Sequence, residues 1–204
     1  MLASGILPGL AFASPASALR EYQAGHFTNA LAEYERLAET STNDLRLIFN
    51  AGVAAYRATN FDAAEKLFQA VTTAPDLKLQ QQAYYNLGNT QYRMSAAAKD
   101  LDALQAAWEG VIKTYERSVN LNTNDVDAAY NLAFTRNGVE QIKQFREAMR
   151  RAKSEADAAV RQRNYHHALE IMEQLTQNQI AAKQFEEFTK KLKDIDAIVT
   201  PRQP

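Results

Sequence analysis

The sequence contains no cysteine among its 204 residues. This absence excludes disulfide bonds, Cys-ligated zinc or iron–sulfur sites and a thiol nucleophile, and it fits either an oxidising compartment or a cytosol. Glycine and proline are also scarce, at 7 and 5 residues. Because these two residues end or weaken helices, their scarcity predicts long helices with few breaks.

The chain also lacks an excess of charge of either sign, since 23 Lys and Arg oppose 24 Asp and Glu for a net charge of −1. A nucleic-acid-binding protein usually carries a clear basic excess, so we expect no nucleic-acid partner. The net charge selects no other class of partner. Apolar residues make up 46% of the chain, enough to bury a continuous core.

Motifs for catalysis and cofactor binding are missing from the sequence. It has no Gly-rich phosphate loop, no nucleophile elbow and no carboxylate pair isolated on an apolar face. The histidines are His26, His166 and His167, which adjoin Phe27 or Tyr165, and no Asp, Glu and His set has metal-ligand spacing. We therefore expect no enzymatic activity, no cofactor and no metal site.

Four segments of the chain share one apolar pattern, in which an aromatic residue is followed by a small residue and then by a second large one. The segments are Phe27-x-x-Ala30-x-x-x-Tyr34-x-x-Leu37, Phe61-x-x-Ala64-x-x-x-Phe68-x-x-Val71, Trp108-x-x-Val111-x-x-x-Tyr115-x-x-Ser118 and Tyr165-x-x-Ala168-x-x-x-Met172-x-x-Leu175. Ala30 and Ala64 are 34 positions apart. That spacing is the period of a helix–turn–helix repeat of the tetratricopeptide type.

A second pattern precedes three of these segments. Its best copy is Tyr-Tyr-Asn-Leu-Gly-Asn-Thr-Gln-Tyr at 84–92, with looser copies at 48–56 and 129–133. The chain thus resembles the tetratricopeptide repeat (TPR) family over most of residues 15–177. The resemblance implies an all-α fold, a right-handed TPR-like α-solenoid of about four helix pairs whose inner wall binds a partner.

The spacing of the segments predicts how the chain is divided. The expected units are 15–44, 45–78, 81–125 and 126–177, followed by a capping helix at 178–198 and a tail at 199–204. An insertion of 11 residues around positions 95–104 is close to three helical turns, so it lengthens helices without rotating their buried face, with Asp100 or Asp102 as a helix cap. A further 23 extra residues before the fourth unit predict one long helix, or two in series, at 125–161.

The first residues, 1–14, form a signal-like apolar segment that ends in Ala11-Phe12-Ala13. The small-x-small ending resembles a secretory signal, although residues 1–18 contain no Lys or Arg. The alternative is a helix packed on the end of the solenoid. A membrane span needs roughly 20 apolar residues, so no span is expected in the mature chain. We expect a periplasmic or membrane-associated protein, with a cytoplasmic one as the alternative.

The TPR resemblance implies that the first helix of each unit lines a concave groove. The side chains expected there are Arg46, Phe49, Asn50, Val53, Tyr56, Arg57, Gln82, Tyr85, Asn86, Asn89, Tyr92, Arg93, Tyr130, Asn131, Phe134 and Asn137. Asn50, Asn86 and Asn131 recur once per repeat, and their amides can bind an extended peptide backbone or hold neighbouring helices together. A clamp for a C-terminal carboxylate is disfavoured, because Gln23 stands where a cation is needed.

We therefore expect a scaffold that binds a peptide or helix of a partner protein, in a bacterial cell-envelope complex. The runs at 84–93 and 127–132 are similar to TPR proteins encoded beside von Willebrand A-domain proteins in bacterial aerotolerance operons. That resemblance implies a membrane-anchored von Willebrand A-domain protein as the partner. The alternative function is a self-associating structural module, a homo-oligomer formed through the long helix and the C-terminal helix.

Overall fold

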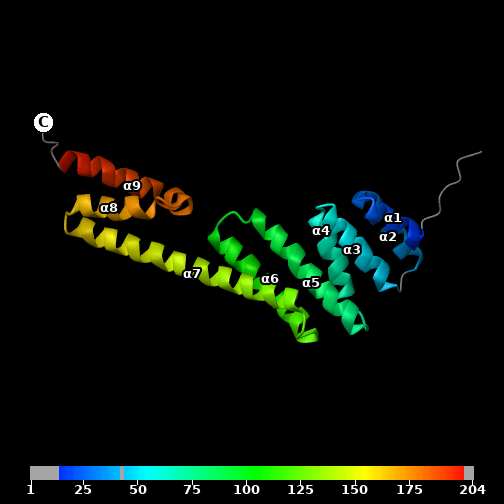
Figure 1. Ribbon diagram of the computed structural model, residues 1–204. Helices are drawn as coiled ribbons and strands as arrows, with labels where there is room; N and C mark the ends of the chain where they lie inside the picture. Colours follow the sequence, from blue (N-terminus) through cyan, green and yellow to red (C-terminus); the bar gives the residue numbers. More distant parts are fainter. Residues whose placement is uncertain (1–13, 42–43, 200–204) are drawn as a thin grey trace, which may run out of the picture. The chain divides into compact units, whose positions relative to one another are not determined.

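The computed structural model describes residues 14–41 and 44–199, and within these ranges it is helical and contains no strand (Figure 1). The elements are α1 (Pro15–Gln23), α2 (Phe27–Thr40), α3 (Leu45–Arg57), α4 (Phe61–Val71), α5 (Leu77–Met94), the 3-10 helix η1 (Ser95–Ala97), α6 (Leu101–Leu121), α7 (Val126–Arg161), α8 (Tyr165–Leu175) and α9 (Gln179–Val199). The all-α prediction is confirmed. The signal-like residues 1–13 and residues 200–204 lie outside the described part.

The chain divides into two compact units, one up to Val139 and one from Glu140. The first unit holds α1 to α6 and the start of α7, and the second holds the rest of α7 with α8 and α9. This division cuts α7, whereas the predicted repeats follow helix pairs, so the predicted repeat boundaries stay a prediction.

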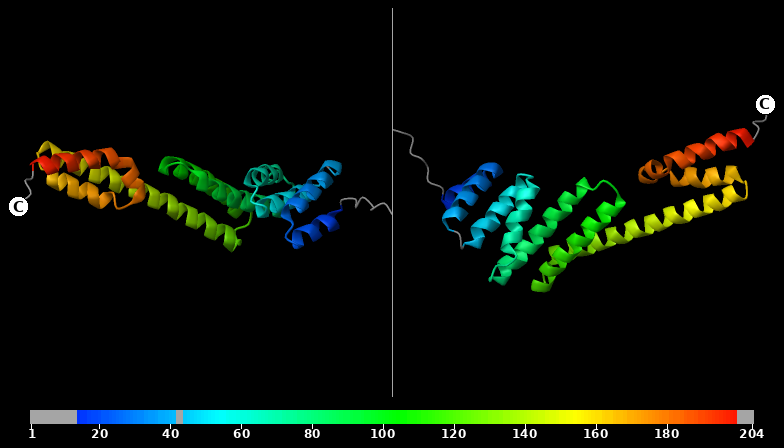
Figure 2. Two further views of the ribbon diagram at one scale, coloured as in Figure 1. Left: turned by 90° about the horizontal axis from the view of Figure 1, so that it is seen from above. Right: turned by 180° about the vertical axis from the view of Figure 1, so that it is seen from behind.

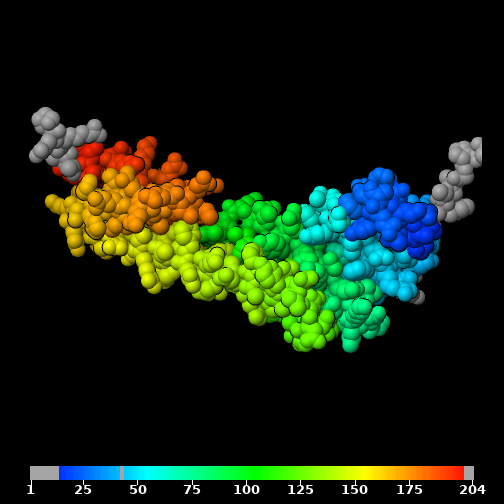
Figure 3. All heavy atoms as spheres, in the orientation of Figure 1, coloured from blue at the N-terminus to red at the C-terminus, as the bar shows by residue number. Residues whose placement is uncertain are grey.

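In the first unit each helix packs against the next one along the chain, from α1 through α6 (Figure 2). The first helices of successive pairs also meet, since α3 contacts α5. Contact between neighbours along the chain is what defines a solenoid. The space-filling view shows that side chains close the gaps between the ribbons of these helices (Figure 3).

Glycines on the first helix of a pair lie beneath aromatic rings of the second helix. A Cβ atom added to Gly52 would lie 2.8 Å from Cε1 of Phe68, and one added to Gly88 would lie 2.6 Å from Cε1 of Tyr115. Both rings are buried. The small-and-large pattern of the sequence therefore sets the close approach of paired helices, because only a residue without a side chain leaves room for the ring.

Three of the turns between paired helices repeat one backbone conformation. Gly25, Thr59 and Arg163 all have positive φ, at 82°, 59° and 60°. Each is followed by a residue whose amide donates to a carbonyl of the preceding helix five positions back, as Asn60 does to Ala55. This is the hydrogen bond of a Schellman helix end, which fixes the angle at which the second helix leaves.

The insertion at 95–104 lengthens two helices. Helices α5 and α6 have 18 and 21 residues, against 13 and 11 in α3 and α4. Asp100, rather than Asp102, caps α6, because its carboxylate accepts the amide of Ala103 at 2.8 Å. The indole of Trp108 donates to the Ser95 hydroxyl at 2.8 Å and so ties α6 to the end of α5.

Residues 126–161 form a single 36-residue helix, α7, and not two helices in series. In the second unit Ala156 of this helix, Ala168 and Met172 of α8, and Leu192 of α9 share one buried cluster. The predicted C-terminal helix therefore buries an apolar face against α8. The ammonium of Lys153 lies 4.1 Å from the ring centroid of Phe188, at the edge of the same cluster.

Candidate partner-binding groove

The first unit carries a pocket of about 280 Å³ on α3, α5, α6 and α7. Its lining residues are Tyr56, Asn89, Tyr92, Arg93, Tyr115, Tyr130, Asn131, Phe134 and Thr135. All of them except Tyr115 and Thr135 belong to the predicted groove. The sequence-derived positions thus converge on one hollow, and that convergence makes it the candidate site.

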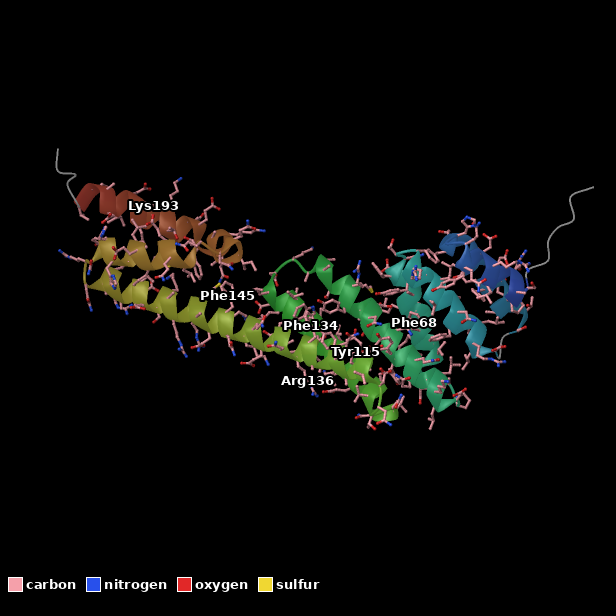
Figure 4. The ribbon with its side chains drawn as sticks, in the orientation of Figure 1. Phe68, Tyr115, Phe134, Arg136, Phe145 and Lys193 are labelled. Carbon is pink, nitrogen blue, oxygen red and sulfur yellow. The ribbon has the colours of Figure 1, made fainter. Side chains whose placement is uncertain are left out.

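Exposed aromatic rings form one wall of the pocket. Tyr130 and Phe134 lie one turn apart on α7, and their side chains are 67% and 50% exposed. Their rings stack with centroids 6.4 Å apart, and Tyr92 meets Phe134 edge-on at 6.1 Å. Figure 4 shows Phe134 and Tyr115 in this region of the first unit. Large aromatic side chains that remain exposed are typical of binding hot spots.

Two asparagines and a buried tyrosine form the polar side of the pocket. The Tyr115 hydroxyl donates to Oδ1 of Asn89 at 2.6 Å, and Nδ2 of Asn131 donates to the same oxygen at 3.0 Å. Tyr115 is only 2% exposed, and this burial raises the pKa of its phenol well above the usual value. The phenol therefore stays protonated near neutral pH. Its hydroxyl can then donate the hydrogen bond that holds Asn89 in place.

The remaining amide groups of this pair have no partner among the described residues. Nδ2 of Asn89 makes no hydrogen bond there, and neither does Oδ1 of Asn131, although both side chains are only partly buried. The pair thus leaves one donor, on Asn89, and one acceptor, on Asn131, without a partner among the described residues. That combination matches the carbonyl and amide of a peptide backbone.

Two arginines of the predicted groove lie over aromatic rings, and one of them, Arg93, lines the pocket. The guanidinium of Arg57 lies 4.6 Å from the ring centroid of Phe27, and that of Arg93 lies 5.6 Å from the centroid of Phe61. Arg46 differs, because it donates to Asp44 at 3.0 Å and lowers the pKa of that carboxyl. Its charge is therefore compensated within the protein.

Several predicted groove residues pack instead of lining the pocket. Phe49 meets Phe68 at 5.7 Å and is partly buried in the core with Val53. The ring centroid of Tyr85 lies 6.4 Å from that of Tyr115. Asn86 donates to the Gln82 carbonyl at 2.8 Å within α5.

The predicted asparagine ladder has unlike members. Asn131 bonds to Asn89 on the facing helix, Asn86 bonds within its own helix, and Asn50 is partly buried without a side-chain bond to a described residue. Asn137 is exposed on α7, one turn beyond the pocket. The binding role of the whole set stays a prediction.

Sequence reasoning missed two lining residues. Tyr115 belongs to the apolar pattern of the third segment and not to the predicted groove, yet its hydroxyl reaches the pocket. Thr135 is fully buried and donates to the Asn131 carbonyl at 2.8 Å. The signal that could have found Tyr115 is its hydroxyl, because a tyrosine buried in a core needs a polar partner.

The described residues hold no group of three or more His, Asp or Glu side chains that could bind a metal ion. In the same part of the chain, no helix combines the length and the apolar character that a membrane span requires.

Comparison with solved structures finds a similar fold in a thermophilic TPR protein of Thermus thermophilus. The TM-score is 0.52 at 10% sequence identity, and the match covers 88% of this chain and 95% of that chain. At this identity the likeness shows the fold alone. No family model matches the sequence, and no curated protein matches it. The protein is therefore a TPR-like α-solenoid, a fold typical of protein-interaction scaffolds.

Proposed function

We propose that this protein is a non-enzymatic scaffold that holds a peptide or helix of a partner protein in the groove of its first unit. The observation that carries the proposal is the exposed aromatic wall of Tyr130 and Phe134 beside the half-satisfied amides of Asn89 and Asn131. Aromatic area supplies affinity, and the amides fix the direction of the bound backbone.

The pocket is small. At about 280 Å³ its volume is close to the lower end of the roughly 300–1,000 Å³ typical of small-molecule sites. One or two apolar side chains of a longer segment fit this space.

The proposal includes a setting and a partner, both supported by the sequence alone. The apolar segment that ends in Ala11-Phe12-Ala13 supports export to the cell envelope. The runs at 84–93 and 127–132 support a membrane-anchored von Willebrand A-domain protein as the partner. Sequencing the N-terminus of the protein from native cells tests the first point, since an intact Met1 argues for a cytosolic chain.

The test of the binding function compares how much partner protein two variants recover. Each variant removes an exposed apolar side chain, one inside the pocket and one outside it. Crosslinked complexes are purified from native extract with the wild type, with Phe134→Ala and with Leu77→Ala. Leu77 is the matched control, because it is 64% exposed and lies outside the pocket. We expect Phe134→Ala to lose a partner that Leu77→Ala retains, and equal recovery by both variants would place recognition elsewhere.

The competing function is self-association, and exposed apolar residues at the end of α9 favour it. Ile198 and Val199 are 80% and 52% exposed, and Ile195 is also exposed. Sedimentation at two concentrations of the wild type and of Ile198→Asp tests this function. A concentration-dependent dimer that Ile198→Asp abolishes would support the self-associating module.

A further inference from the structure

The two stacked arginines of the groove recur at the same place in successive repeats. Arg57 is the last residue of α3 and covers Phe27, the first residue of α2. Arg93 is the penultimate residue of α5 and covers Phe61, the first residue of α4. Each first helix thus ends with a guanidinium lying on the ring that opens the second helix of the preceding pair.

Neither arginine has an acidic partner among the residues that the structure describes. Both side chains are exposed, and neither makes an ion pair or a side-chain hydrogen bond with any residue that the structure describes. A cation–π contact uses none of the N–H donors of a guanidinium for hydrogen bonding, so these donors remain available. The protein therefore presents two guanidinium groups with available N–H donors. No described residue neutralises their charge.

The groove is positive although the whole chain is nearly neutral. The predicted groove residues include Arg46, Arg57 and Arg93 but no Asp, Glu or Lys, while the chain has a net charge of −1. Asp44 compensates Arg46, so two positive charges remain. Arg93 is also the one charged residue among the described residues lining the pocket. A cationic ligand is therefore disfavoured there despite the aromatic rings, and an acidic one is favoured.

We propose that the segment bound in the groove is acidic, with two side-chain carboxylates on Arg57 and Arg93 and an apolar side chain in the aromatic pocket. This proposal rests on the proposed function. It differs from a clamp for a chain end, because the ligands are side-chain carboxylates and no free C-terminus is required. Guanidinium and carboxylate can form paired hydrogen bonds, which gives Arg its preference for this ligand.

The spacing of the two carboxylates follows from the helix packing. Arg57 and Arg93 lie on α3 and α5, which are in contact, and packed helices have axes about 8–10 Å apart. An extended segment advances about 3.3 Å per residue. Because alternate side chains of such a segment point to the same side, acidic residues two positions apart, about 7 Å, match the two arginines within the reach of their side chains.

The experiment uses fluorescein-labelled ten-residue peptides of Gly and Ser that contain one Phe and two Asp. The separation of the two Asp and their distance from the Phe are varied, and each peptide has a partner in which Asn replaces both Asp. Binding to the full chain is measured by fluorescence anisotropy. We expect the best Asp peptide to bind about tenfold more tightly than its Asn partner at low salt, and the ratio to fall as salt rises.

Variants connect this preference to the two arginines. Arg57→Gln and Arg93→Gln should each lower the Asp-to-Asn ratio about threefold. Arg117→Gln is the matched control, because Arg117 also stacks on a ring, Tyr84, at 5.9 Å but lies on the second helix α6. It should leave the ratio unchanged. Phe134→Ala should weaken the Asp and Asn peptides alike.

The outcomes separate the two proposals. Equal binding of Asp and Asn peptides that Phe134→Ala weakens would overturn the acidic preference and leave the groove function standing. An Asp preference that survives Arg57→Gln/Arg93→Gln would overturn the assignment to these residues. Binding of no peptide would overturn the acidic proposal and count against the groove as well.

Discussion

A Cβ atom added to Gly138 would lie 2.0 Å from Cζ3 of Trp108, so α7 rests on the indole ring of α6 at this glycine. Trp108 is the first residue of the apolar pattern in its segment, as Phe61 is in the preceding segment. Arg93 lies over the ring of Phe61. Tyr92 stacks on the same indole with centroids 5.6 Å apart. The ring is therefore held between α5 and α7, next to the candidate groove.

Gly138→Ala is expected to destabilise the protein by about 1–3 kcal/mol, because a methyl group has no room beside the indole and forces it or α7 to move. The matched control is Gly110→Ala on α6, where an added Cβ meets nothing within 4 Å. That change should stabilise the protein by roughly 0.5–1 kcal/mol through helix propensity. Chemical denaturation of both variants is the measurement, and the same sign for both would contradict the packing.

Thr59→Gly is expected to stabilise the protein by roughly 0.5–1 kcal/mol, because Thr59 has φ of 59° and a β-branched residue is strained there. Thr73→Gly is the control, since Thr73 is exposed in another turn without positive φ. It should be neutral or destabilising, because glycine makes the unfolded chain more flexible. Thermal unfolding compares the two, and a loss of stability in Thr59→Gly would refute the strain.

Tyr115→Phe removes the hydroxyl that donates to Asn89. The variant should lose about 1–2 kcal/mol of stability, since the acceptor of a buried hydrogen bond loses a partner. Tyr34→Phe is the control, because Tyr34 is similarly buried but makes no side-chain hydrogen bond to a described residue. Urea denaturation should show at most about 0.5 kcal/mol for the control. Similar losses for the two variants would mean that the bond to Asn89 contributes nothing.

The imidazole of His166 has a pKa above its usual value, chiefly because Nδ1 lies 3.3 Å from a carboxylate oxygen of Asp196, with Glu170 adding to the effect. Asp196→Asn should lower this pKa. Asp194→Asn removes a charge from the same helix, α9, without this contact and should leave it unchanged. Titration of the imidazole resonances by NMR distinguishes them, and identical titrations in both variants would contradict the contact.

The sign of the pH effect follows from this shift. A raised folded-state pKa means that the contribution of His166 to stability is complete below its unfolded pKa, about 6.5. The contribution is lost as the pH rises through the folded-state value. Because the imidazole is exposed on the surface, the effect on unfolding is small, and the NMR titration is the sensitive readout.

The helix pairs could be predicted from sequence because the repeat places its largest and smallest residues at fixed positions. Ala30 and Ala64 mark the close contacts, and Phe68 and Tyr115 fill the space between helices. A period of 34 residues leaves little freedom in how such pairs stack. A cap for α6 was likewise predicted, with Asp100 and Asp102 as alternatives, and the structure places it at Asp100.

Other features depended on details that a repeat pattern does not carry. Phe49 and Val53 belong to the predicted groove, and the structure shows both of them partly buried against the core. The hydroxyl of Tyr115 reaches the pocket, although Tyr115 belongs to the apolar pattern and not to the predicted groove. Thr59 has a positive φ that its residue type does not favour, and only the repeated geometry of the turn requires it.

The most direct test of the central claim is site-specific photocrosslinking in the native cell. A photoreactive phenylalanine analogue replaces Tyr130 on the pocket wall or, as the control, Leu77, which is similarly exposed outside the pocket. The account predicts that the probe at position 130 attaches to one defined segment of a partner protein and that the probe at position 77 does not. Attachment of the same partner from both positions, or only from position 77, would contradict a groove-bound segment.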